Sequence, residues 1–153
     1  MKIDMVNNDD NLKKLALDGG VLIALAIGEK SSNAIKEEIS EGRVDALASN
    51  IALMELLYII CRKFGWNIAV EKKQYLLESK MISFIETREL IEAAAKLKCK
   101  RAIAMADCFT LAIAISYSCK AIFARKELEL EKEMKKTPFD VAIEFLSPES
   151  VYE

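Results

Sequence analysis

The sequence predicts an α/β domain of three layers, with helices on both faces of a central, mostly parallel sheet. Two observations carry this prediction. Short apolar segments alternate with helical patterns along the chain, and the strand segments are apolar throughout rather than at every second residue. Strands buried on both faces are typical of parallel sheets, whose crossover helices cover them.

Glycine and capping residues delimit the elements of the first half. Gly28, Gly42 and Gly65 each follow a helical pattern and are expected to end it. Serine and asparagine provide side-chain oxygens for the N-caps of the next helices, at Ser31 or Ser32 and at Ser49 or Asn50. The expected order is strand Leu15–Asp18, helix Val21–Ile27, a helix from Ser31 or Ser32 to Glu41, strand Val44–Ala48 and helix Ile51–Phe64.

The second half continues the alternation. A helix over Trp66–Ser79 is amphipathic, and we expect Ile68, Tyr75, Leu76 and Leu77 to face the core. Thr87 is the expected N-cap of the next helix, and Pro138 ends the last one. The order is strand Met81–Ile85, helix Arg88–Lys98, helix Ala104–Tyr117, strand Ala121–Ala124, helix Glu127–Lys136 and strand Val141–Leu146.

Length and composition fix the class of protein. The 153 residues suit one domain, which we place at 12–153 after a flexible tail at 1–11. With no His, catalysis by a Ser–His or Cys–His pair is excluded, and a classical zinc site is not expected. The four cysteines show no CxxC spacing, so we expect buried thiols in a reducing cytoplasm. Neither a signal peptide nor a membrane span is expected.

Three carboxylates stand alone in the most apolar segments. Asp18, Glu55 and Asp107 are each the only charged residue in runs of 11 to 18 residues, at 15–28, 51–61 and 102–119. A buried carboxylate costs about several kcal/mol of folding free energy unless it is protonated, paired or bound to metal. None of the three runs contains a cationic side chain that could pair with its acid.

The predicted topology brings these acids together. Asp18 ends a strand, while Glu55 and Asp107 lie near the starts of helices, and all three places share the carboxyl edge of a parallel sheet. Hard oxygen ligands without His or Cys suit Mg²⁺ or Mn²⁺. Such a centre can activate water for hydrolysis of a phosphodiester. Each acid also has a structural alternative: Asp18 as a turn former, Glu55 as the partner of a distant lysine, and Asp107 as a helix N-cap.

The segments around these acids resemble the PIN-domain family, and within it VapC-type toxin ribonucleases and their archaeal relatives. The resemblance lies in 15–25 (LALDGGVLIAL), 49–58 (SNIALMELLY) and 107–114 (DCFTLAIA) followed by 121–124 (AIFA), and it spans about 15–146. It implies a metal-dependent ribonuclease that holds Mg²⁺ or Mn²⁺ with three to four acids, of which Asp18, Glu55 and Asp107 match the first three. It also implies RNA as substrate, frequent homodimers and a small antitoxin partner.

The chain departs from the family pattern at two places. Many members carry Ser or Thr two residues after the first acid, where this chain has Gly20. The fourth acid, usually an Asp after the strand at 121–124, matches Glu127 best and Glu129 as an alternative. Both also suit a charged helix face. These departures motivate a second hypothesis, a PIN-like domain that binds RNA or forms a dimer scaffold without cleaving.

Basic residues flank the predicted metal centre. Lys96, Lys98, Lys100 and Arg101 precede Asp107, and Arg125 and Lys126 precede Glu127. Phosphate contacts by such residues bind nucleic acid without regard to its sequence. The alternative is a solvated helix end. For Phe64 and Trp66, core packing or a dimer contact is expected ahead of stacking on a base. A receiver-type phospho-acceptor domain fits poorly, because Glu86 stands where its acceptor Asp would follow the third strand.

Overall fold

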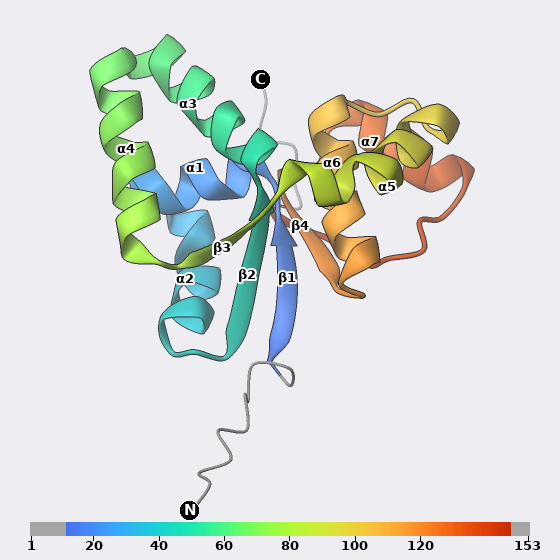
Figure 1. Ribbon diagram of the computed structural model, residues 1–153, viewed down its shortest axis with the longest axis horizontal. Helices are drawn as coiled ribbons and strands as arrows, with labels where there is room; N and C mark the ends of the chain where they lie inside the picture. Colours follow the sequence, from blue (N-terminus) through green and yellow to red (C-terminus); the bar gives the residue numbers. More distant parts are fainter. Residues whose placement is uncertain (1–11, 148–153) are drawn as a thin grey trace, which may run out of the picture.

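The computed structural model describes residues 12–147 and places a sheet between two groups of helices (Figure 1). The expected tail at 1–11 and the end of the predicted domain at 148–153 lie outside the described residues. The elements are β1 Lys13–Leu17, α1 Gly19–Ile27, a 3₁₀ turn η2 Lys30–Ser32, α2 Asn33–Ser40, β2 Val44–Ser49, α3 Asn50–Phe64, α4 Trp66–Ser79, β3 Ile82–Ile85, α5 Thr87–Lys100, α6 Met105–Ser116, β4 Lys120–Arg125, α7 Leu128–Lys136 and β5 Ile143–Ser147.

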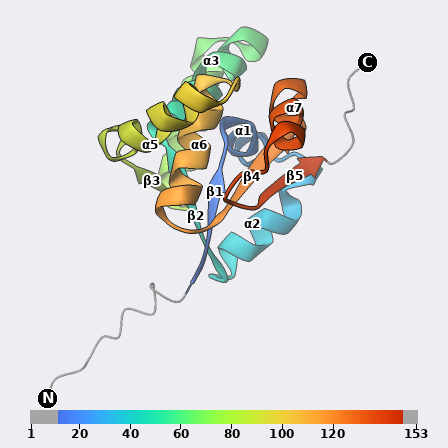
Figure 2. The ribbon, with the colours of Figure 1, turned by 90° about the vertical axis from the view of Figure 1, so that its right-hand side faces the viewer.

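All pairings in the described sheet are parallel, and the strand order is β3-β2-β1-β4-β5. Helices α1 to α4 lie on one side of the sheet and α5 to α7 on the other (Figures 1 and 2). The three-layer α/β/α prediction is therefore confirmed. Each predicted strand and helix is present, with ends that coincide or differ by at most two residues.

Successive side chains of the central strands point to opposite faces of the sheet and pack in two separate hydrophobic cores. Leu15, Leu17 and Ile122 pack with the apolar side chains of α1, α3 and α4. Ala16 and Phe123 pack with those of α5, α6 and α7 on the opposite face. Because both faces are covered, the strands have no polar face, which explains their continuous apolar sequence.

The prediction of which residues of α4 face the core is wrong for three of the four residues. Ile68, Tyr75 and Leu77 remain 38%, 44% and 39% exposed, while Leu76 is 1% exposed as expected. Ala69 is also buried, so the contact stripe of α4 runs through two residues seven positions apart. A small residue in this stripe lets α4 approach its neighbours and leaves the larger apolar side chains at the edge of the contact.

Three smaller expectations also differ from the structure. Thr87 is the first residue of α5, and Glu86 takes the N-cap position without a side-chain bond. Cys99 is exposed rather than buried, because it lies in the last turn of α5. Phe64 and Trp66 are 58% and 59% exposed, so neither packs in the core. No helix in the described part of the chain is both long and apolar enough to cross a membrane.

Candidate active site

The order of the strands creates a crevice between β1 and β4. From β1 the chain moves outward to β2 and β3, and then returns to the other side of β1 as β4. Loops leaving the carboxyl ends of β1 and β4 therefore diverge, and such a switch point is where parallel sheets bind ligands. Asp18 follows β1 and Glu127 follows β4 at this edge.

Asp18 is the N-cap of α1 and is held by two backbone N–H groups. Its Oδ1 accepts from Val21 at 2.9 Å and from Ala124 at 3.3 Å, and the second of these donors comes from the end of β4. Burial raises the pKa of Asp18 to about 8, and the carboxylates of Glu55 and Asp107 add to that rise, while the two N–H donors oppose it.

A pair of glycines lets the neighbouring elements approach Asp18 closely. A Cβ on Gly19 would stand 2.2 Å from Oε1 and 2.8 Å from Cβ of Glu55. A Cβ on Gly20 would stand 2.7 Å from Cβ of Ala124. The Cβ that a Ser or Thr would bring to position 20 would thus collide with the methyl group of Ala124. The missing side chain at Gly20 has a steric reason.

Glu55 and Asp107 reach the same place from helices on opposite faces of the sheet. Glu55 lies in the second turn of α3, and burial raises its pKa, with a further rise from Glu127. Asp107 lies in the first turn of α6 and is 7% exposed. Burial raises the pKa of Asp107 to about 7, and Glu127, Glu55 and then Glu129 raise it further by repulsion. Repulsion therefore acts between Asp18 and both Glu55 and Asp107, and between Glu127 and both Glu55 and Asp107.

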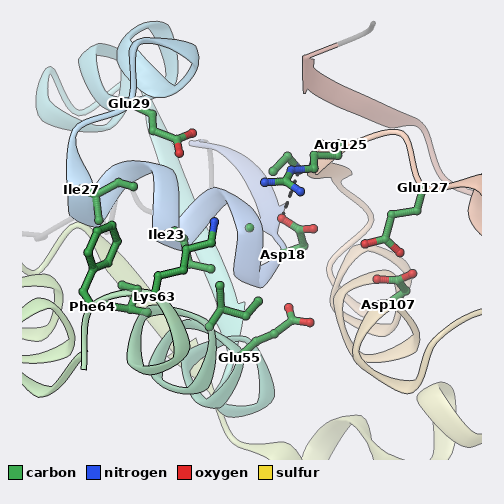
Figure 3. Close-up of a pocket in the computed structure, with 14 residues that line it drawn as sticks. Asp18, Ile23, Ile27, Glu29, Glu55, Lys63, Phe64, Asp107, Arg125 and Glu127 are labelled. Carbon is green, nitrogen blue, oxygen red and sulfur yellow. Dashed lines mark hydrogen bonds between the residues drawn. The ribbon is translucent and has the colours of Figure 1, made fainter. Parts of the chain in front are cut away.

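The four acids line one cavity of about 430 Å³. In Figure 3 the carboxylates of Asp18, Glu55, Asp107 and Glu127 lie around its open centre. Together with Glu29, carboxylates outnumber the cationic residues of the lining five to two. Glu129, the alternative fourth acid, lines a different cavity. In the described part of the chain, no three of these groups already stand close enough to form a metal site.

The same cavity continues as a groove between α1 and α3. Ile23 and Ile27 line it from α1, and Ile59, Lys63 and Phe64 line it from α3. On α3, Glu55, Ile59 and Lys63 follow one another at intervals of four residues, which places them on one face. Sequence reasoning missed Lys63 as a cleft residue, although its helical spacing from Glu55 could have indicated it.

The predicted basic residues divide into different environments. The guanidinium of Arg101 donates to the backbone oxygens of Thr137 and Pro138 at 2.5 and 3.0 Å and stacks on Phe139, so its contacts are internal. Arg125 lines the acid cavity, and Lys126 lies 3.7 Å from Glu131. The three remaining lysines are exposed in the second half of α5: Lys96, Lys98 and Lys100.

Comparison with known structures identifies the fold. VapBC2 from Rickettsia felis bound to a promoter DNA fragment matches with a TM-score of 0.61 and 16% identity, over 86% of this chain and 98% of that chain. VapC20 of Mycobacterium tuberculosis, a sarcin–ricin loop cleaving toxin, matches with a TM-score of 0.59 and 18% identity, over 78% and 94%. DNA-bound VapBC from Salmonella typhimurium has a TM-score of 0.59 and 16% identity, over 89% and 99%.

At these identities the likeness is one of fold. No curated protein matches the sequence. The model of the PIN domain matches residues 15–143, a range that contains most of β1, all of β2 to β4, and the four acids Asp18, Glu55, Asp107 and Glu127. Sequence and fold agree, and the chain belongs to the PIN-domain family.

Proposed function

We propose that this protein is a metal-dependent endoribonuclease of the VapC type, with its centre at Asp18, Glu55, Asp107 and Glu127. One observation carries the proposal: four acids from separate elements line a single cavity at the switch point of the sheet. Isolated structural acids would be paired or dispersed, whereas burial and then mutual repulsion raise the pKa of three of these acids. Such repulsion is typical of functional sites.

The donor set suits a hard divalent cation. All four side chains offer carboxylate oxygens, and Mg²⁺ and Mn²⁺ prefer such ligands. Because the four carboxylates line the cavity without converging, we expect the flexible side chains of Glu55 and Glu127 to turn inward when a cation binds. Bound there, the cation would activate water for attack on a phosphodiester and offset the charge on the leaving oxygen.

The chain's own residues prepare this centre. Two backbone N–H donors fix Asp18 in one orientation, so one acid is placed before any ligand arrives. A pKa of about 8 for Asp18 and about 7 for Asp107 means that protons occupy these groups near neutral pH until a cation displaces them. With no His in the chain, a histidine cannot supply the general base.

We propose RNA as the substrate and a small antitoxin as a protein partner. Arg125 is proposed to contact the phosphate at the centre, with Lys126 and Lys100 further out, whereas the internal contacts of Arg101 give it a structural role. The apolar groove between α1 and α3 would suit an antitoxin segment whose basic end reaches the acids. The same proposal includes a homodimer and a cytoplasmic location.

The test is cleavage of labelled total tRNA by the pure protein in Mn²⁺, Mg²⁺ or EDTA. We expect cleavage with a divalent cation, none in EDTA, and a loss of at least 100-fold (~) in Asp107→Asn, as expected when a metal ligand is removed. Glu71→Gln, which changes an exposed acid of α4, is the matched control. Asp107→Asn that cleaves as wild type would refute the proposed centre.

A second reading is a domain that binds RNA without cleaving it. The absence, within residues 12–147, of three acids already in metal-binding proximity favours it. Calorimetry distinguishes the two readings: micromolar binding of Mn²⁺ that is lost in Asp107→Asn supports the nuclease, and no binding supports the scaffold.

A further inference from the structure

A second cavity, of about 390 Å³, lies beside the acid cleft and is rich in lysine. Lys98 enters it from α5, and Lys132 and Lys136 enter it from α7. Its remaining walls are Ala102, Ile103, Ala104, Glu129 and Glu133. Two of its lysines, Lys132 and Lys136, belong to α7 and are not among the basic residues expected to flank the metal centre.

The ion pairs of the fold do not neutralise all of the lysines in this cavity. Glu133 is 7% exposed, and Arg101 lies 3.9 Å from it as a largely buried partner. Lys136 lies 3.5 Å from the same glutamate, so one buried carboxylate has two cations. Lys132 forms no ion pair with any residue in 12–147. The three lysines that line the cavity outnumber its two glutamates, Glu129 and Glu133, by one charge.

One of the lysines is already held in position. Nζ of Lys98 donates to the carbonyl oxygen of Ile103 at 2.7 Å. An ammonium group has three N–H donors, so two of them remain for a ligand. Because this long side chain is fixed by an internal bond, less conformational entropy is lost when it binds an anion.

The two cavities share a wall. Ala104 precedes α6 and lines the lysine cavity, while Asp107 lines the acid cleft three residues later, ~4.5 Å along the helix axis. At the start of α7, Glu127 lines the acid cleft and Glu129 the lysine cavity. Repulsion between Glu129 and Asp107 acts across this wall. The two cavities therefore lie next to each other at the starts of α6 and α7, as two phosphate sites along one strand require.

We infer that Lys98, Lys132 and Lys136 bind a backbone phosphate of the substrate strand next to the phosphodiester that lies at the acids. This inference rests on the proposed nuclease function and adds a path for the strand: out of the cleft, across the first turn of α7, and into the lysine cavity. The site recognises phosphate and not the sugar or base, so strands of RNA and DNA of equal length gain equally from it.

Binding is measured on a metal-free, ¹⁵N-labelled protein, so that cleavage plays no part. Titration with a single-stranded RNA hexamer is expected to shift the amide signals of Ala102, Ile103 and Ala104. In Lys132→Gln/Lys136→Gln we expect affinity to fall ~10-fold at low salt, and the slope of log K against log salt to decrease by ~1 to 2, as two phosphate contacts are lost. A DNA hexamer is expected to lose the same factor.

Lys135→Gln is the matched control. Lys135 is also on α7, is 75% exposed and faces Glu131 at 3.4 Å, outside the cavity. Equal losses in Lys135→Gln and the double variant, or an unchanged salt slope in the double variant, would overturn the inference. Both results are independent of the nuclease proposal, which fails separately if metal-dependent cleavage is absent or survives Asp107→Asn.

Discussion

Replacement of Gly20 by alanine tests whether the close approach of β4 shapes the acid centre. The new Cβ would stand 2.7 Å from Cβ of Ala124. Carbon atoms pack at ~3.5–4.0 Å, so the end of β4 must move by ~1 Å. Oδ1 of Asp18 accepts from the Ala124 N–H at 3.3 Å, so a shift of that size breaks this bond and leaves Val21 as its remaining N–H donor.

The expected change in stability is the balance of one favourable and two unfavourable effects. Alanine in a helix is favoured over glycine by ~1 kcal/mol. Overpacking of a filled site costs ~1–3 kcal/mol, and loss of a hydrogen bond to a carboxylate ~1.5–3 kcal/mol. We therefore expect net destabilisation of ~2–4 kcal/mol and a fall in Tm of roughly several degrees. Mn²⁺ affinity should fall ~10-fold, because Asp18 loses its fixed orientation.

A compensating change makes this prediction specific. In Gly20→Ala/Ala124→Gly the methyl group moves from one side of the contact to the other, so the space filled is the same. Thermal unfolding with and without Mn²⁺, and calorimetric titration with Mn²⁺, compare this variant with each single change. We expect the double variant to regain most of the lost stability and metal affinity. A stabilising Gly20→Ala, or a double variant no better than Gly20→Ala, would refute the steric argument.

Three further predictions concern charge. Between about pH 4 and pH 8 the folded, metal-free protein binds more protons than the unfolded chain, because the pKa of Asp18 rises to about 8 and that of Asp107 to about 7. The contribution of these two groups to the free energy of unfolding is thus fully present below the unfolded pKa of about 4, and it falls by about a few kcal/mol as pH rises towards 8. Urea unfolding at a series of pH values should show this decrease. In Asp18→Asn the decrease should be smaller. Mn²⁺ at pH 7 should release protons and raise Tm, and calorimetry in buffers of different ionisation enthalpy measures the release; no proton release would contradict the raised pKa values. Arg101→Met should destabilise the protein by ~3–5 kcal/mol, because buried Glu133 loses one of its two cations and the backbone oxygens of Thr137 and Pro138 lose their donor. Arg101→Met/Glu133→Gln should recover part of this in urea unfolding.

The fold and the four acids could be predicted because local sequence carries them. Solitary carboxylates such as Asp18 and Asp107 in apolar runs need a shared solution, and the parallel topology supplies one edge for it. Of the two N-caps expected for α3, Ser49 or Asn50, Ser49 takes the position, and its oxygen accepts the N–H of Ala52 three residues along the chain. Such features depend on neighbours within a few positions.

Features that depend on distant partners could not be predicted. Arg101 lies in a basic cluster of the kind that suggests RNA binding. Its guanidinium instead donates to backbone oxygens that lie 32 to 37 residues further along the chain. The inner face of α4 depends on which helices pack against it. Ala69 belongs to that face, but an alanine is too small to mark a core position in the sequence. The choice between Glu127 and Glu129 depends on backbone geometry after β4, which a two-residue difference in sequence does not reveal.

The bond from Ala124 to Asp18 joins residues 106 positions apart, and this has a consequence for the order of folding. The segment β1 to β3 contains one side of the sheet, and its pairings join strands that follow one another in sequence. The acid centre is complete only after β4 has inserted beside β1, a long-range step that is intrinsically slow. A chain still emerging from the ribosome therefore lacks both the second donor to Asp18 and Glu127, so the proposed nuclease becomes active only after most of its own synthesis is finished.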